Sequence, residues 1–198
     1  MINTYIALFR GINVGGKNIL PMRDLRALLG KLGAKGVNTY LQSGNAVFRY
    51  DMGDVNRLGV RIGSAIRESH GFEPHVFLLD VAGLEKAVKL NPFPEAVSNP
   101  KSVHVFFLDS VPVKPDLGAI ERMKKGNERY LLKEDLFYLH APDGVGRSQL
   151  AARAEKAFGV RATARNWRSV CEIQKLAKQV ASETSRLLGG LSHIVPPK

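Results

Sequence analysis

Cationic, amide and glycine residues are concentrated in one short segment near the start of the chain. Residues 10–18 read Arg-Gly-Ile-Asn-Val-Gly-Gly-Lys-Asn and follow directly on an apolar run. Because glycine has no Cβ atom, a ligand can approach its backbone closely, and successive exposed N–H groups form a concavity that binds anions. Arg10 can add a two-pronged hydrogen-bond donor and Lys17 a second positive charge. This composition predicts an anion-binding loop, and it identifies neither the anion nor a reaction.

A second polar segment, Gln42-Ser43-Gly44-Asn45, lies between the apolar runs 37–41 and 46–50 and is typical of a β-hairpin turn. Before the glycine-rich loop, residues 4–9 predict a strand, and after it an apolar stripe over residues 22–32 predicts a helix. In a ferredoxin-like sheet the first and second strands are parallel and the third lies between them. We therefore expect the glycine-rich loop and the hairpin turn to lie at the same edge of the sheet.

The rest of the chain completes and then repeats one order of elements. A helix at 55–66 and a strand at 75–79 give the order β-α-β-β-α-β, the ferredoxin-like unit. The elements expected after it are a helix at 80–90, strands at 103–108, 129–132, 136–140 and 160–163, and helices at 117–126, 150–158 and 170–180. The predicted fold class is α+β, with two ferredoxin-like halves, an extra helix in each, and mixed, mostly antiparallel sheets.

The predicted domain organisation follows from the same pattern. The first half with its extra helix covers residues 1–90, and a proline-containing connection covers 91–102. The second half with its extra helix covers 103–182, and a tail without periodicity covers 183–198.

The second half offers its own candidate cluster. Its third and fourth strands are expected to be parallel, so the loop 144–148 should lie beside the segment 163–167. Both segments lead into helices, whose N-termini carry unpaired amides and a partial positive charge. With Arg147 and Arg165 at two helix starts, the pattern predicts a phosphate or carboxylate pocket.

An architectural explanation competes with both clusters. Glycine-rich segments and Ser-Gly-Asn are ordinary turn chemistry, Thr163 or Asn166 would serve as a helix N-cap, and Trp167 would anchor a core. The candidate ligand-binding residues are Arg10, Asn13, Gly15, Gly16, Lys17, Asn18, Gln42, Ser43, Asn45, Arg147, Ser148, Arg165, Asn166 and Trp167.

The overall charge is strongly basic. The chain has 29 Lys and Arg against 18 Asp and Glu, a net charge of +11, and such an excess favours nucleic acid or phosphorylated ligands. Because the charges are scattered, a merely solvated basic surface is the alternative.

The single cysteine, Cys171, fits a reducing compartment. No membrane-length apolar run or signal-peptide pattern is present, so we expect a cytoplasmic protein without a membrane partner.

Segment 11–17 satisfies the GxxxxGK pattern of a P-loop. Two features argue against a P-loop nucleotide hydrolase. Pro21 delays the helix that should begin at Lys17, and the early hairpin contradicts a parallel sheet. The histidines show no metal-ligand spacing, so we expect no metal and no cofactor.

The chain resembles the domain-of-unknown-function family 1697, whose members are small, mainly bacterial proteins. The matching segments are Leu-Phe-Arg-Gly-Ile-Asn-Val-Gly-Gly-Lys-Asn at 8–18, Tyr-Leu-Gln-Ser-Gly-Asn-Ala-Val-Phe at 40–48, Asn-Pro-Phe at 91–93 and Thr-Ala-Arg-Asn-Trp at 163–167. The family's usual Asn-Thr-Val after Asn-Trp is replaced by Arg-Ser-Val at 168–170. The resemblance implies ferredoxin-like subdomains and no established activity.

Three functions are compatible with these residues. The leading hypothesis is binding of a phosphate-bearing ligand, a nucleotide or nucleic acid, through the basic and glycine-rich loops. The alternative is a metal-independent enzyme for a small anionic substrate, with Ser43 or Ser148 polarised nearby. A structural role would be favoured if hydrogen bonds within the loops satisfied all their polar groups.

Overall fold

The computed structural model describes residues 2–42, 44–51 and 55–189. The chain divides into two compact units, Met1–Leu84 with Glu172–Lys198 and Glu85–Cys171. The boundaries between the units fall inside helix α3 (Val81–Lys89) and helix α7 (Trp167–Gly189).

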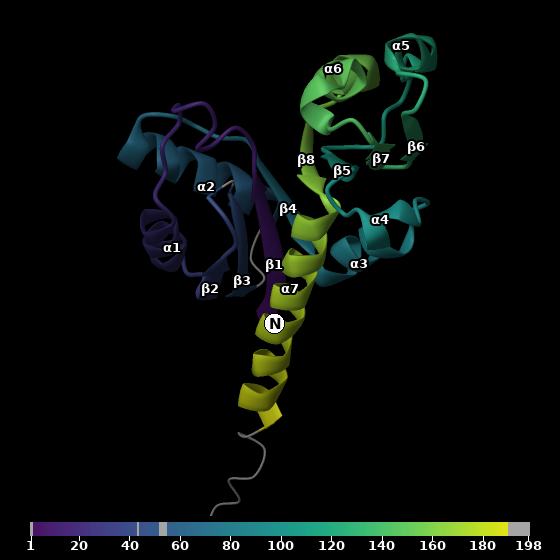
Figure 1. The fold of residues 1–198 in the computed structure, drawn as a ribbon. Coiled ribbons are helices and arrows are strands. Elements are labelled where there is room, and N and C mark those ends of the chain that lie inside the picture. The colour runs from purple at the N-terminus through teal and green to yellow at the C-terminus, as the bar shows by residue number, and fades with distance from the viewer. Residues whose placement is uncertain (1, 43, 52–54, 190–198) are drawn as a thin grey trace, which may run out of the picture. The chain divides into compact units, whose positions relative to one another are not determined.

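The first unit contains a four-stranded sheet in the order β2-β3-β1-β4. Its elements along the chain are β1 (Ile2–Phe9), α1 (Met22–Lys31), β2 (Lys35–Thr39), β3 (Asn45–Asp51), α2 (Val55–His70) and β4 (Val76–Asp80). Because β1 and β2 are both antiparallel to the strand between them, they are parallel to each other. The predicted β-α-β-β-α-β order of this half is confirmed (Figure 1).

Alternation along β1 directs one set of side chains toward the two helices. Tyr5, Ala7 and Phe9 belong to one buried cluster, as period-2 alternation requires for side chains on one face. The helices meet this face with apolar stripes of period 3.6. Their buried members are Met22, Leu25, Leu28 and Leu29 on α1 and Leu58, Ile62 and Ile66 on α2. This packing holds the β1–α1 loop at the end of the sheet.

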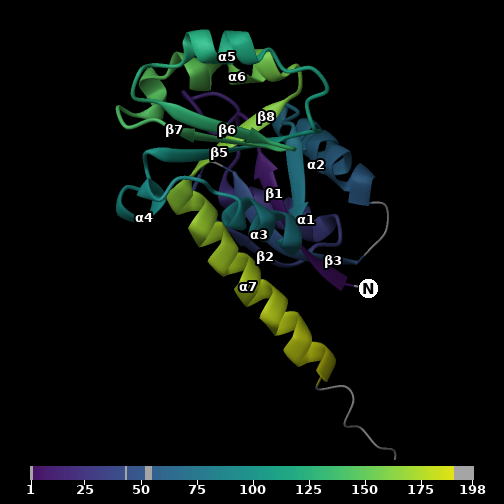
Figure 2. The same cartoon turned by 90° about the vertical axis from the view of Figure 1, so that its right-hand side faces the viewer.

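The second unit repeats the pattern with the strand order β6-β7-β5-β8. Its elements are α4 (Glu95–Ser98), β5 (Val103–Leu108), α5 (Leu117–Met123), β6 (Arg129–Lys133), β7 (Leu136–His140), the 3-10 turn η1 (Val145–Arg147), α6 (Gln149–Phe158) and β8 (Ala162–Asn166). Figure 2 shows α5 and α6 on one side of this sheet and α4 with α3 on the other. The predicted α+β class with two similar halves is therefore confirmed.

Aromatic packing and one buried hydrogen bond hold the layers of the second unit together. The Phe137 ring lies at the centre, 5.4 Å from the Phe106 ring and 4.8 Å from the Phe158 ring on α6. On the other face, the Tyr138 hydroxyl donates a 2.7 Å hydrogen bond to the Ala87 carbonyl of α3.

Several predicted boundaries are wrong. The last strand covers Ala162–Asn166 instead of 160–163, so the expected loop 163–167 is mostly strand. Helix α7 continues to Gly189, past the predicted start of the tail at 183, and residues 190–198 lie outside the described part of the chain. The short α4 was not predicted. Among the described residues, no helix combines the length and apolar character needed to cross a bilayer.

Candidate functional site

The glycine-rich loop after β1 folds as a miniature hairpin. Val14 and Lys17 form a β-bridge, and the Lys17 N–H donates to the Val14 carbonyl at 3.1 Å. The two residues between them, Gly15 and Gly16, have φ angles of 59° and 73°. Positive φ at both central residues is what a type I′ turn requires, and glycine adopts it without steric cost. The turn geometry by itself is therefore a sufficient reason for glycine at both positions.

Two asparagines fasten this hairpin from within. Asn13 and Asn18 have φ angles of 53° and 52°, a region that asparagine tolerates better than most residues. The Asn13 N–H donates to the Asn18 carbonyl at 3.0 Å, and the Asn18 amide donates to the Gly11 carbonyl at 2.9 Å. The Asn13 side chain accepts from the Leu20 N–H at 2.8 Å and donates to the Leu20 carbonyl at 2.9 Å. Both side chains therefore serve the loop's own architecture.

The predicted convergence of the loop with the β2–β3 turn is confirmed. The Asn13 amide donates a 2.7 Å hydrogen bond to the Gln42 carbonyl. Asn45 closes the turn, because its amide donates to the Tyr40 carbonyl at 2.9 Å. Ser43, which was predicted to take part, lies outside the described residues.

Several polar groups at this edge face solvent. The side chains of Arg10, Lys17 and Gln42 are exposed. In the part of the chain that the structure describes, the N–H groups of Gly15 and Gly16 enter no hydrogen bond, and a Cβ placed on either glycine would meet nothing within 4 Å. Neither segment 10–21 nor segment 39–45 contains a carboxylate. We call the described residues of these two segments (10–21, 39–42 and 44–45) the first-unit loop edge, and its exposed groups suit an anion.

The two arginines of the second predicted cluster occupy different environments. Arg165 lies in β8 and is buried, and its guanidinium donates to the Thr163 hydroxyl at 2.9 Å and to the Ala164 carbonyl at 2.8 Å. Burial lowers the pKa of Arg165 to about 10. Arg147 ends η1 and is exposed. The prediction that two solvent-facing arginines lie at two helix starts is therefore wrong, because only Arg147 is exposed.

The other residues of the second cluster have architectural roles. The Ser148 hydroxyl accepts from the Ala151 N–H at 3.0 Å and caps α6. The Asn166 side chain accepts from the Ser169 N–H at 2.8 Å at the start of α7, and Trp167 is buried. These are the N-cap and core roles of the architectural explanation.

The structure excludes the P-loop interpretation of segment 11–17. A P-loop passes directly from its lysine into a helix, whereas here Lys17 closes a turn and α1 begins at Met22. Every strand pair among the described residues is antiparallel, unlike the parallel sheet of P-loop enzymes.

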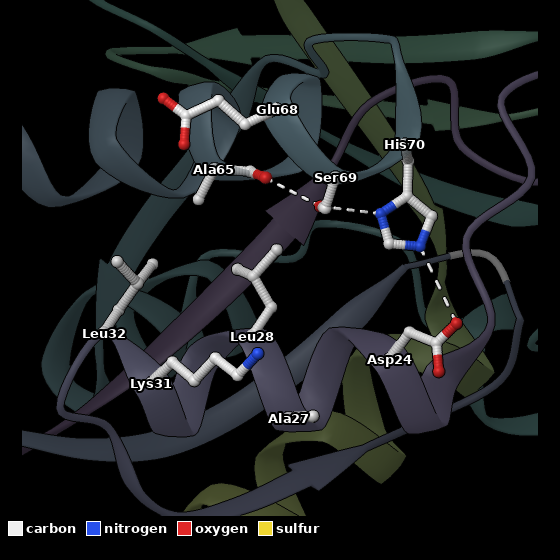
Figure 3. Close-up of a pocket in the computed structure, with 9 residues that line it drawn as sticks. All are labelled: Asp24, Ala27, Leu28, Lys31, Leu32, Ala65, Glu68, Ser69 and His70. Atoms are coloured by element: carbon white, nitrogen blue, oxygen red, sulfur yellow. Dashed lines mark hydrogen bonds and ion pairs between the residues drawn. The ribbon is translucent and has the colours of Figure 1, made fainter.

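A groove of about 460 Å³ lies between α1 and α2, and sequence reasoning missed it. Figure 3 shows a row of polar groups at one end, with Ser69 and His70 from α2 and Asp24 from α1. The Ser69 Oγ is 2.8 Å from His70 Nδ1, and His70 Nε2 is 3.7 Å from the Asp24 carboxylate. The remaining lining residues are Ala27, Leu28, Lys31, Leu32, Ala65 and Glu68. No local motif links residues so far apart in sequence.

The Ser69, His70 and Asp24 row is not arranged as a nucleophilic triad. Ser69 Oγ also lies 2.7 Å from the Ala65 carbonyl, which can accept the single hydroxyl proton. The distance of 3.7 Å between His70 and Asp24 exceeds that of a hydrogen bond. The row also lies at the C-terminal end of α2, where helix carbonyls oppose a developing oxyanion. We therefore assign it no catalytic role.

In the second unit, a charged cluster around Arg129 connects α4 to the sheet. The Arg129 guanidinium pairs with the Glu95 carboxylate, lies 3.1 Å from His140 Nδ1 and is 5.2 Å from the centre of the Phe93 ring. A hydrogen bond from its own backbone and then the Arg129 guanidinium lower the pKa of Glu95. Asn91 accepts from the Phe93 N–H at 3.1 Å, which orders the Asn-Pro-Phe segment. These contacts give the Asn-Pro-Phe segment a structural role in the second unit.

Within the described residues, no three side chains of the types that ligate metals are grouped together.

The chain matches no curated protein. A solved structure, the conserved bacterial protein SP0830 from Streptococcus pneumoniae, is similar at 22% identity and a TM-score of 0.67, covering 89% of this chain and 99% of that one. This likeness shows a shared fold. The family model for the proteins of unknown function DUF1697 matches residues 2–138, which is more than half of the chain. The chain therefore belongs to the DUF1697 family.

Proposed function

We propose that the protein binds a phosphate-bearing ligand, a nucleotide or a nucleic acid, at the first-unit loop edge. The observation that carries the proposal is the exposed turn at Gly15 and Gly16. Its N–H groups enter no hydrogen bond among the described residues, and Lys17 lies beside them with no carboxylate in either segment. An anion at this turn would accept N–H hydrogen bonds and pair with a cation.

Neighbouring side chains extend the same chemistry. Arg10, exposed at the base of the loop, can donate two parallel hydrogen bonds to a phosphate. Gln42 carries both a donor and an acceptor at the adjoining turn. We leave Asn13, Asn18 and Asn45 out of the proposed contact set because their side chains bind the backbone.

The exposure of these groups sets the expected strength of binding. A single ion pair in water contributes about 1 kcal/mol or less, so one phosphate would be held weakly and several would be needed for useful affinity. The net charge of +11 favours such a polyanion by raising its concentration near the surface. Binding should therefore weaken steeply with added salt.

The test is fluorescence anisotropy of a labelled single-stranded RNA, titrated with the protein across a salt series. Wild type should give a linear log–log plot with a slope of about −0.7 per phosphate contact. Arg10→Ala and Lys17→Ala should each weaken binding and make the slope shallower by about one contact. The matched control is Lys35→Ala, because Lys35 is also exposed but begins β2, at the strand end away from the Gln42 turn.

Two results would contradict nucleic-acid binding at this site. Absence of RNA binding at low salt would remove nucleic acid as the ligand despite the basic charge and leave only a nucleotide. Equal weakening by Lys35→Ala and Lys17→Ala would show a diffuse charge effect and no site at this edge.

A further inference from the structure

The first-unit loop edge also presents apolar side chains to solvent. Val14, Ile19 and Leu41 are 63%, 57% and 55% exposed. Val14 and Ile19 flank the glycine turn and Lys17, and Leu41 directly precedes Gln42. Single exposed apolar residues are common, but these three lie beside cations on two segments that the Asn13–Gln42 hydrogen bond joins, which favours an interaction surface. An inorganic phosphate would make no use of these side chains.

The backbone at Leu41 supports a functional reason for its exposure. Leu41 has a φ of 57°, in the left-handed region that is unfavourable for a residue with a Cβ atom. The chain keeps this conformation because Tyr40 and Asn45 pair on either side of it, with a backbone hydrogen bond of 2.9 Å. A leucine that is held in strain and more than half exposed contributes little to a core, and strained positions cluster at ligand sites.

We infer that the phosphate-bearing ligand is a single-stranded nucleic acid whose bases pack on these apolar side chains. This inference rests on the proposed function. Phosphates would lie at Lys17 and the glycine turn, and base faces would cover Ile19 and Leu41. The Gln42 amide would meet a base edge, since it offers one acceptor and two donors. Every base has an apolar face, so this packing tolerates different sequences.

The kind of side chain favours this ligand form over others. A duplex hides its base faces in the stack, whereas an unpaired strand can place them on Ile19 and Leu41. A single nucleotide could do the same, but its phosphates would make too few of the weak ionic contacts for useful affinity. Aromatic side chains are the strongest platforms for stacked bases, and the aromatic residue of these segments, Tyr40, is half-buried. Aliphatic packing should therefore add a smaller increment to the phosphate contacts.

The experiment compares two labelled single strands of equal length, one of ordinary DNA and one in which every base is replaced by an abasic site. Both carry the same phosphates, so their affinities differ only through the bases. The test variant combines Ile19→Ser with Leu41→Asn, because asparagine tolerates the left-handed backbone of residue 41. The control is Val60→Ser, at an exposed apolar position on α2.

Wild type should bind the ordinary strand about threefold or more tighter than the abasic strand. The double variant should lose that difference and keep wild-type affinity for the abasic strand. Val60→Ser should behave as wild type, and Lys17→Ala should weaken both strands alike. Thermal unfolding of each variant checks that the fold is retained.

The contrary results separate the two proposals. Equal wild-type affinity for the two strands, or equal loss on both in the double variant, would overturn the role of the bases and leave phosphate binding standing. Failure of both strands to bind at low salt would instead overturn nucleic-acid binding, the proposed function on which this inference rests.

Discussion

The side-chain amide of Asn13 donates a 2.7 Å hydrogen bond to the main-chain carbonyl of Gln42. This bond joins the β1–α1 loop to the β2–β3 turn, two segments that the parallel arrangement of β1 and β2 brings to one edge. Because the same side chain also makes two hydrogen bonds with Leu20, it fixes the miniature hairpin against the sheet. The positions of Lys17 and Gln42 relative to each other thus depend on one asparagine.

Asn13→Ala should destabilise the protein by about 2 to 3 kcal/mol, from lost hydrogen bonds and from the cost of placing alanine at positive φ. Asn13→Gly removes the same hydrogen bonds but accepts the φ of 53°, so it should cost about 1 kcal/mol less than alanine. Urea unfolding measures both. Asn38→Ala, which loses one exposed hydrogen bond to the Gly36 carbonyl, is the matched control. Equal losses at positions 13 and 38 would contradict the anchoring role of Asn13.

Gly44→Ala should be much more costly than Gly15→Ala, although both glycines have positive φ. A Cβ on Gly44 would lie 2.6 Å from Ile12 Cδ1 and 2.8 Å from Phe9 Cβ, whereas one on Gly15 would meet nothing within 4 Å. The Phe9 Cβ is fixed to the backbone and cannot move aside. We expect a loss of about 3 kcal/mol or more at Gly44 and about 1 kcal/mol at Gly15. Similar unfolding midpoints for the two variants would argue against this close packing.

Local sequence patterns predicted the first-unit loop edge because the order of strands and helices alone determines which loops meet there. Apolar runs of period 2 and 3.6 identify the strands and helices, and the ferredoxin-like order then brings segments 10–18 and 42–45 together. The roles inside the loop were beyond local patterns. Asparagine and glycine suit a turn and an anion site alike, and only the Asn13 and Asn18 hydrogen bonds decide which role they take.

The second cluster shows why a boundary error changes a functional interpretation. A charged residue near the end of a short apolar run looks like the start of a loop, so Arg165 was expected to face solvent. In the structure it continues β8, where it is paired in register with Val105 of β5, and its side chain is buried. Whether a buried arginine belongs to a strand depends on the neighbouring strands, which local patterns do not reveal.

The N-cap role of Asn166 leads to a further prediction. Asn166→Ala should destabilise the protein by about 1 kcal/mol, since the Ser169 N–H loses its acceptor. Asn166→Asp keeps an acceptor and adds negative charge at the start of α7, which the helix dipole favours, so its stability should equal or exceed that of wild type. Chemical unfolding of the three proteins at neutral pH gives the comparison. A loss in the aspartate variant as large as in the alanine variant would refute the capping role.

Stability should fall in mild acid because of His104. Its Nδ1 is buried and has no hydrogen-bond partner among the described residues. Burial lowers the pKa of His104 from 6.5 to about 4, partly opposed by a hydrogen bond with the Ser102 backbone. The unfolded chain therefore takes up this proton near pH 6.5, while the folded protein resists it until about pH 4. Stability from this group is constant above that window and declines as the pH falls through it.

Between about pH 7 and pH 5 the loss from His104 should be about 2 kcal/mol. Urea unfolding at each pH measures it, with His104→Phe as the comparison, because phenylalanine keeps a ring at this buried position and has no proton to gain. The variant should lack this part of the pH dependence, so its stability relative to wild type should improve as the pH falls. The same decline in both proteins would show that other groups cause the acid sensitivity and that His104 is protonated without penalty in the folded state.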